Sequence, residues 1–513
     1  WARAVGGPAL RAMTIHERAL MLKAVGLKLM DQKEEFYLEN FATGATRADG
    51  WIDIEGGIGT LLTFASTARR ELPNTKVLTE GPVEPLSRDG SFSAQHILTP
   101  LQGVAVHINA VNFPVWGMLE KIAPTLIAGM PCVVKPASQT AYLTELVVRR
   151  ILETGILPDG ALQIVTGSAG DLLDHVNEQD VVTFTGSAST GQKLKSGAAI
   201  LQNSVRFTME ADSLNASLLG ADAGPGTDEF SLFIKEVSRE MTVKAGQKCT
   251  AIRRIIVPQA HEDAVVEALS ARLASTPIGL PDNENTRMGA LVSLKDREDV
   301  KAKVGILAKE AEIVSGSLDA VALSSGDSDS GAFLSPILLR CAEPAAADAV
   351  HSVEAFGPVA TVMGYSDNAE AVALSQKGRG SLVSSLFTDD STVAREIVTG
   401  LAPFHGRVLI GNRRSAKSST GHGSPLAPLV HGGPGRAGGG EEMGGMRGVK
   451  HFMQRSAIQG TPELLSAVTG QWTEGADAHS DIHPFRKSLA DLRIGDQLIT
   501  KARAVTREDV AHY

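Results

Sequence analysis

Strand-length apolar runs alternate with longer helical segments between residues 103 and 209, and this alternation constrains the fold more than any other feature of the chain. Consecutive strands joined by helices run parallel in one sheet. The pattern therefore predicts a doubly wound α/β sheet, with a ligand site beyond the carboxyl ends of its strands. The expected strands are 103–109, 131–135, 162–166, 181–184 and 206–209.

Small or polar residues follow these expected strands and outline a nucleotide crevice. They are Asn109 to Asn112, Lys135 to Ser138, Thr166-Gly167 and Thr185-Gly186-Ser187. The dinucleotide fingerprint G-x-G-x-x-G is missing from this region, and Gly186 and Gly191 are spaced differently. By itself, that pair of glycines indicates either a phosphate-binding turn or an ordinary strand-to-helix turn.

A second alternating pattern, between residues 211 and 401, predicts a second α/β domain, which a chain of 513 residues is long enough to contain. Helices are expected at 228–245 and 261–273, and strands at 252–258, 334–339 and 360–363. Residues 432–448 hold nine glycines. This segment predicts either a flexible loop or, because Arg436, Glu441, Glu442 and Arg447 are interleaved in it, a folded and ion-paired turn.

Composition excludes several classes of function. Hydrophobic residues make up 43% and charged residues 21%, which is typical of a globular chain. The net charge of −9, with scattered basic residues, argues against binding to nucleic acid or an anionic membrane. No apolar run reaches the roughly 18 residues of a membrane span. Three widely separated cysteines predict free thiols and a cytoplasmic location.

Both ends of the chain suggest that more protein lies beyond them. The sequence opens at Trp1 directly in helical spacing, so we expect a truncated N-terminus, followed by a helix that Thr14 and Glu17 cap and that stops near Gly44. A polar linker is expected at 471–482. Residues 483–513, with a strand at 497–500 and a new helix cap at Thr506, are expected to begin a further domain.

Cys249 is the candidate nucleophile, because Lys248 and Arg253 stand beside it and cationic neighbours lower the pKa of a thiol. Cys132 and Cys341 lie in apolar surroundings and are expected to be buried packing residues. Glu210 ends an expected strand and is either a general base or a solvated strand-end acid. Asn112 either donates to an oxyanion or forms an Asx-turn.

Taken in order along the chain, these signals resemble the aldehyde dehydrogenase family. The matching elements are Asn112-Phe-Pro114, Lys135-Pro136, Phe184-Thr-Gly-Ser187 with Gly191, Glu210, Gly246-Gln-Lys-Cys249 and Glu354-Ala-Phe-Gly-Pro358, which span roughly 1–459. The resemblance implies an aldehyde dehydrogenase fold with a Rossmann-like cofactor domain at 1–210 and an α/β catalytic domain at 211–405. It further implies a protruding oligomerisation hairpin near 82–100 and a returning segment at 406–470.

The resemblance also implies the roles of individual residues. Cys249 would be the nucleophile, Glu210 the general base and Asn112 an oxyanion donor, with no metal required. The implied cofactor contacts are Ala110, Lys135, Ser138, Gly167, Gly186, Ser187, Glu354 and Phe356. Ser138 stands where the family commonly has a carboxylate that would repel a 2′-phosphate, so we expect NADP to be favoured over NAD. Family members form homo-oligomers through the hairpin, and we expect the same here.

Four further segments resemble a branch of the family that oxidises CoA-linked semialdehydes in aromatic degradation: 210–215, 247–254, 420–425 and 431–441. The implied substrate is 3-oxo-5,6-dehydrosuberyl-CoA semialdehyde of aerobic phenylacetate degradation, in bifunctional proteins whose hot-dog hydratase-like domain resembles the stub from His483. We expect ring-opening hydrolase activity to be absent from this chain. The alternatives are 3,4-dehydroadipyl-CoA semialdehyde, a thioester hydrolase without redox chemistry, or a non-catalytic scaffold. Residues 211–213 depart from the usual Leu-Gly-Gly of the family.

Overall fold

The computed structural model describes residues 1–329 and 331–477. A parallel five-stranded sheet in the order β5-β4-β3-β6-β7 confirms the expected doubly wound arrangement. Its apolar strands are short and almost fully buried, as strands covered on both faces must be. The bounds are β3 (Ala105–Ile108), β4 (Cys132–Lys135), β5 (Leu162–Ile164), β6 (Val181–Thr185) and β7 (Arg206–Glu210).

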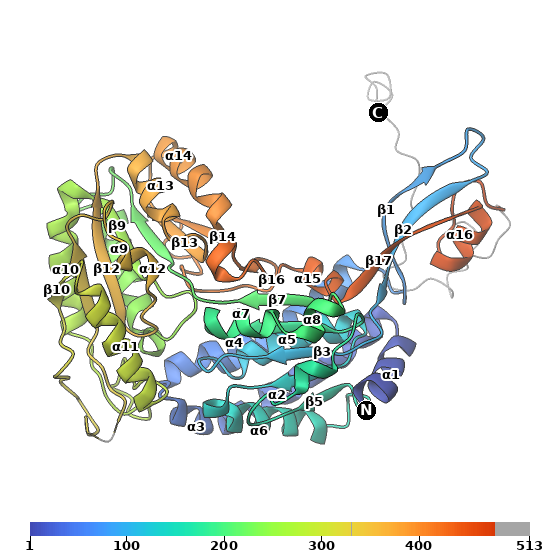
Figure 1. The fold of residues 1–513 in the computed structure, drawn as a ribbon, viewed down its shortest axis with the longest axis horizontal. Coiled ribbons are helices and arrows are strands. Elements are labelled where there is room, and N and C mark those ends of the chain that lie inside the picture. The colour runs from blue at the N-terminus through green and yellow to red at the C-terminus, as the bar shows by residue number, and fades with distance from the viewer. Residues whose placement is uncertain (330, 478–513) are drawn as a thin grey trace.

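Helices from both the N-terminus and the crossovers cover this sheet (Figure 1). The expected capping box at Thr14 and Glu17 is present, and Gly44, with φ +80°, ends the N-terminal helical run, which is interrupted once at Gln32. Gly129, with φ +95°, ends α5 as expected. The helices are α1 (Gly7–Ala12), α2 (Ile15–Asp31), α3 (Lys33–Asn40), α4 (Arg47–Glu71), α5 (Trp116–Ala128), α6 (Ala141–Glu153), α7 (Ala188–Lys195) and α8 (Ala198–Gln202).

A second, seven-stranded sheet has the order β10-β11-β12-β9-β8-β13-β14, and all its neighbours are parallel except β10 and β11. Its strands are β8 (Ala216–Leu219), β9 (Arg254–Pro258), β10 (Glu312–Ser315), β11 (Ile337–Cys341), β12 (Val359–Tyr365), β13 (Ser381–Phe387) and β14 (His405–Gly411). Its helices are α9 (Asp228–Thr242), α10 (Glu262–Ala274), α11 (Leu294–Leu307), α12 (Ala349–Ser352), α13 (Asn368–Gln376) and α14 (Ser391–Leu401). The sheet thus continues past residue 405.

Two expected elements of this region differ from the structure for local reasons. The helix expected at 228–245 ends at Thr242, because Lys244 and Ala245 adopt left-handed backbone angles. The strand expected from residue 334 begins at Ile337, directly after Pro336, whose nitrogen has no hydrogen to donate to a neighbouring strand.

The expected hairpin is formed by β1 (Leu78–Pro85) and β2 (Ser93–Pro100), and β17 (Met453–Gly460) completes its three-stranded sheet. Figure 1 shows these strands extending from the body together with α16 (Pro462–Thr469). The glycine-rich segment is folded, through β15 (Val430–Gly432), β16 (Glu441–Met443) and α15 (Met446–Lys450). Its Arg447–Glu441 ion pair, at 3.0 Å, confirms the folded alternative.

Several expectations fall on residues that the structure leaves undescribed. These are the end of the 471–482 linker and the whole of 483–513, with its strand at 497–500 and its cap at Thr506. The division into domains at 210 and 405 also stays a prediction. Within residues 1–329 and 331–477, there is no helix that is both long enough and apolar enough to cross a bilayer.

The two glycines of the expected phosphate turn lie close to the sheet, and this contact yields a stability prediction. A Cβ on Gly191 would stand 2.4 Å from the Met209 sulfur and 2.9 Å from the Phe184 ring. We expect Gly191→Ala to lower the free energy of unfolding by about 1–3 kcal/mol, because α7 must move away from β6. Denaturant unfolding measures this change.

Gly59→Ala is the matched control for this substitution. Gly59 lies in the middle of α4, and a Cβ there meets nothing within 4 Å. Alanine should therefore leave stability unchanged or raise it by up to about 1 kcal/mol. An equal loss of stability in both variants would contradict the close packing of α7 against the sheet.

Candidate active site

A cleft of about 550 Å³ lies at the carboxyl ends of β3, β6 and β7. Nine of the residues expected at the site line it: Ala110, Asn112, Ser138, Gly186, Ser187, Glu210, Cys249, Glu354 and Phe356. Two are not among the lining residues. Lys135 is buried and donates through Nζ to the Pro136 carbonyl at 2.8 Å, and Gly167 accepts from the Ser138 hydroxyl at 3.3 Å.

Cys249 follows a left-handed turn that aims it into the cleft. Lys244, Ala245 and Gly246 have φ values of 52°, 50° and 68°, and only glycine adopts such angles without cost. A Cβ on Gly246 would lie 2.2 Å from the Gly357 carbonyl, so the backbone there must stay bare. Buried Lys244 fixes the turn by donating to the Thr43 carbonyl and hydroxyl at 2.6 and 2.7 Å.

Lys248 lowers the pKa of the Cys249 thiol, as expected, but burial and nearby carboxylates outweigh it. Lys248 donates to both Glu240 carboxylate oxygens at 2.9 and 2.7 Å, and Arg253 donates to the Gly357 carbonyl at 2.6 Å. Burial raises the pKa of the Cys249 thiol well above its ordinary value, and the negative charge of Glu210 raises it further. Cys132 and Cys341 are buried, as expected.

Asn112 is held by the segment that connects β3 to α5. The Asp53 carboxylate accepts the backbone N–H groups of Val115 and Trp116 at 3.0 and 2.7 Å, which fixes the start of α5. Asn112 is buried and lines the cleft with Cys249. Among the hydrogen bonds of the described residues, none ties the Asn112 side chain to a nearby backbone group, as an Asx-turn would require.

Glu210 is 1% exposed, so the alternative of a solvated strand-end acid is wrong. It belongs to a buried group of charges that we call the carboxylate cluster: Glu120, Lys121, Glu210, His431 and Glu442. Lys121 Nζ lies 2.7 Å from Glu120 and 3.2 Å from Glu442. Oxygens of the three carboxylates all lie within 4.8 Å of one another.

The three carboxylates of the carboxylate cluster differ in the direction of their pKa shifts. Burial raises the pKa of Glu210, but the nearby His431 and Lys121 outweigh it and hold that pKa below its ordinary value. Burial raises the pKa of Glu120 and of Glu442, and the neighbouring carboxylates raise both further. Glu210 is thus the member of the cluster that keeps its negative charge, directly beside the Cys249 thiol.

His431 was not among the residues expected at the site, although it opens one of the family-like segments. Its Nε2 lies 3.2 Å from Glu210 Oε2 and 3.9 Å from Cys249 Sγ, and its ring packs edge-on against Trp116 at 5.3 Å. Lys121 was also missed. The available signal was a charged pair, Glu120-Lys121, inside the otherwise apolar segment that forms α5.

The cofactor side of the cleft contains buried polar atoms that make no hydrogen bond within the described chain. Glu354 Oε1 and Thr185 Oγ1 have no hydrogen bond. Burial raises the pKa of Glu354 to about 7, although Arg253, at 3.6 Å, opposes this shift. Ser187 caps the N-terminus of α7. These groups suit a ribose and phosphates, so the cleft fits a nicotinamide dinucleotide.

The departure at residues 211–213 is accommodated by new hydrogen bonds. Asp212 Oδ1 accepts the Ala188 N–H at 2.9 Å, at the start of α7. The Ser213 hydroxyl donates to Asn215 Oδ1 at 2.6 Å and accepts the Leu382 N–H at 2.9 Å. The segment is therefore tied to α7 on one side and to β13 of the second sheet on the other.

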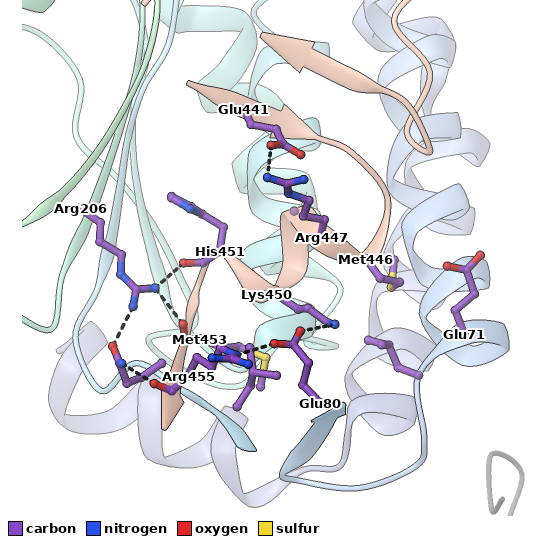
Figure 2. A pocket seen from close by; sticks show the side chains of 14 residues that line it. Glu71, Glu80, Arg206, Glu441, Met446, Arg447, Lys450, His451, Met453 and Arg455 are labelled. Carbon is purple, nitrogen blue, oxygen red and sulfur yellow. Dashed lines mark hydrogen bonds and ion pairs between the residues drawn. The ribbon is translucent and has the colours of Figure 1, made fainter. Parts of the chain in front are cut away.

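A larger cavity, of about 770 Å³, lies at the base of the hairpin and contains none of the expected site residues. Figure 2 shows Glu80 between Lys450 and Arg455, at 2.8 and 2.6 Å, and Arg206 donating to the carbonyls of His451 and Met453. Because its cations already have partners, this cavity is a structural joint between β1, β7 and β17.

The comparisons with known proteins agree with this geometry. Residues 2–458 match the model of the aldehyde dehydrogenase family, and the chain belongs to that family. It is accordingly an NAD(P)-dependent oxidoreductase that acts on aldehydes.

Two curated proteins are similar to this chain. A 3,4-dehydroadipyl-CoA semialdehyde dehydrogenase of Aromatoleum evansii is 44% identical over 437 residues, which cover 85% of this chain and 84% of that protein. Protein MaoC of Klebsiella aerogenes is 47% identical over 231 residues, 44% of this chain and 66% of that protein.

Solved structures share the fold at lower identity. The crystal structure of PnpE from Pseudomonas sp. WBC-3 matches with a TM-score of 0.77 and 24% identity, over 89% of this chain and 87% of that one. Betaine aldehyde dehydrogenase of Staphylococcus aureus, in complex with NAD⁺, matches with a TM-score of 0.77 and 23% identity, over 89% and 88% of the two chains.

The contact between Glu210 and Cys249 predicts the direction of a pKa change. Glu210→Gln removes the negative charge that raises the thiol pKa, so the pKa of Cys249 should fall. The rate of alkylation by iodoacetamide, measured against pH in the absence of cofactor, should then reach half its maximum at a lower pH. Glu240→Gln, which leaves the carboxylate cluster intact, is the control. A midpoint that stays or rises in Glu210→Gln would contradict the effect of the Glu210 charge on the thiol pKa.

Proposed function

We propose that this chain oxidises a CoA-linked semialdehyde of aromatic degradation to the carboxylic acid, with NADP as cofactor. The observation that carries the proposal is the convergence of Cys249, Glu210 and Asn112 on one cleft whose other end fits a dinucleotide. The 44% identity to a dehydrogenase of such a substrate supports it. A cytoplasmic location and a homo-oligomer assembled through the hairpin belong to the same proposal.

In the first half of the reaction, the Cys249 thiolate attacks the aldehyde carbon. The half-buried thiol has a raised pKa and is protonated at rest, so its proton must leave as the carbonyl arrives. Glu210 is the adjacent ionised base, and it passes the proton on to solvent. The developing oxyanion accepts hydrogen bonds from the Asn112 amide and the Cys249 N–H. A cofactor bound in the cleft would accept the hydride from the thiohemiacetal carbon, and a thioester would then remain on Cys249. Ser187, Glu354 and Phe356 would hold that cofactor.

In the second half, Glu210 takes a proton from water, which attacks the thioester and releases the acid and the thiolate. Glu210 must be ionised again at this stage. Lys121 and His431 serve this requirement, because both stabilise its negative charge inside a buried site.

Two aldehydes are candidate substrates. We favour 3-oxo-5,6-dehydrosuberyl-CoA semialdehyde, with 3,4-dehydroadipyl-CoA semialdehyde as the alternative that the Aromatoleum relative's name supports. Both carry a CoA handle whose binding energy can orient the reacting end. Ring-opening hydrolysis is proposed to lie outside this chain. A thioester hydrolase without redox chemistry would have no use for Glu354 in the crevice, where one of its oxygens makes no hydrogen bond.

Comparing the three cysteines tests the proposed function. With a CoA-linked semialdehyde and NADP, Cys249→Ala should reduce the rate of nicotinamide reduction by about a thousandfold or more. Cys132→Ala and Cys341→Ala, which alter only buried packing, should keep most of the activity. A comparable loss in all three variants would point to folding instead and would refute Cys249 as the nucleophile.

The choice of cofactor gives a separate test at Ser138. This exposed serine brings no charge, whereas a carboxylate there would repel a 2′-phosphate by roughly 1–4 kcal/mol at intermediate dielectric. We expect NADP to be favoured about tenfold or more, and Ser138→Glu to move the ratio of kcat/KM values toward NAD. Gln139→Glu is the neighbouring control. An unchanged ratio in Ser138→Glu would mean that this position does not contact the phosphate.

A further inference from the structure

Three ligand-type atoms converge on one point at the edge of the carboxylate cluster. Cys249 Sγ and His431 Nε2 are 3.9 Å apart, and His431 Nε2 and Glu210 Oε2 are 3.2 Å apart. One ligand atom from each of the three residues lies within 4.8 Å of both others. The side chains come from three separate segments, so only the tertiary fold brings them together.

These separations fit one tetrahedral metal ion. With zinc bonds of about 2.3 Å to sulfur and about 2.1 Å to nitrogen and oxygen, tetrahedral angles place sulfur about 3.6 Å from nitrogen and nitrogen about 3.4 Å from oxygen. The two distances given above for His431 each differ from these values by a few tenths of an ångström. Small rotations of the side chains would close that difference.

The His431 ring directs the same nitrogen toward both partners. A proton relay from thiol to carboxylate through an imidazole uses its two nitrogens, one for each neighbour. Here Nε2 faces Cys249 and Glu210 together. A single cation between the three atoms requires this arrangement, because each residue then contributes one lone pair to the same centre.

The charge of the surroundings favours a cation. Both oxygens of Glu210 are buried and have no hydrogen bond among the described residues, and the same is true of both Glu442 oxygens. Three carboxylates share one lysine, Lys121, which contacts Glu120 and Glu442. A divalent ion beside Glu210 would contact the ionised carboxylate of the cluster and satisfy oxygens that lack hydrogen bonds.

From this geometry we propose that Cys249, His431 and Glu210 form an inhibitory Zn²⁺ site. One thiolate, one imidazole and one carboxylate suit zinc, whereas magnesium and calcium prefer oxygen ligands alone. As the zinc–sulfur bond forms, the thiol proton leaves to solvent, and no oxidant or reductant is required. The ion enters through the cleft that Cys249 and Glu210 line and keeps its fourth position open to water.

The site would act as a reversible block. Zinc occupies the nucleophile and the base together, so an aldehyde cannot react until a chelator removes the ion. It would also protect the Cys249 sulfur from alkylation and oxidation while bound. The ion has no part in the oxidation itself.

Direct binding to the metal-free protein tests the proposal without aldehyde or cofactor. ZnCl₂ is titrated in competition with a chromophoric chelator, and alkylation of Cys249 by iodoacetamide is followed by mass spectrometry. We expect one zinc per chain at the site, and slower alkylation of Cys249 that EDTA reverses. His431→Phe keeps a ring against Trp116 but removes the nitrogen, and it should weaken zinc binding roughly tenfold or more.

Matched variants keep the result interpretable. Glu210→Gln is nearly isosteric and should weaken zinc binding similarly. It provides the test if His431→Phe does not fold. His451→Phe and Cys341→Ser change a histidine and a cysteine outside the site and should bind zinc as the unmodified protein does. Unchanged affinity in Cys249→Ala, in Glu210→Gln or in folded His431→Phe would overturn the proposal. So would zinc binding that leaves Cys249 alkylation unaffected. Because no turnover is measured, these outcomes are independent of the proposed oxidation.

Discussion

The burial of an ionised Glu210 against a thiol is the constraint on which the rest of the site depends. A carboxylate that is 1% exposed needs compensating charge, and Lys121 and His431 supply it from α5 and β15. This need accounts for a lysine inside an otherwise apolar helix and for a glycine-rich segment folded back over that helix. The chemistry of the cleft is thus supported by elements that do not themselves line it.

The sequence predicted the parts of the fold that local patterns determine. Alternating apolar runs located the five strands of the first sheet, and Gly129 and the Thr14–Glu17 pair located helix ends. The expected lining of the cleft followed from motif order. Nine of eleven predicted residues line it. Lys135 does not, because strand-end position does not specify the direction of its side chain, which donates to the Pro136 carbonyl. Gly167 lies beside the cleft and reaches it only through Ser138, whose hydroxyl donates to its carbonyl.

The pKa of the Cys249 thiol could not be predicted from its sequence neighbours. Lys248 and Arg253 are near Cys249 along the chain, but both donate to buried acceptors, and the lowering effect of Lys248 on the thiol pKa is outweighed. The groups that govern the thiol are Glu210 and the residues around it, more than 30 positions away along the chain. Only the folded chain brings these together, so the carboxylate cluster could not be predicted from spacing.

The glycine-rich segment lies between two strands that are fixed in sheets. β14 fixes the chain before it in the seven-stranded sheet, and β17 fixes the chain after it in the hairpin, where it pairs with β2 along eight residues. The segment is thus held on one side by the seven-stranded sheet and on the other by the hairpin sheet. Its nine glycines let it follow a close path over β7, while its anchors set the positions of His431 and Glu442. A shift of the hairpin relative to the body would therefore reach His431 and Glu442 through this segment, and through them Glu210.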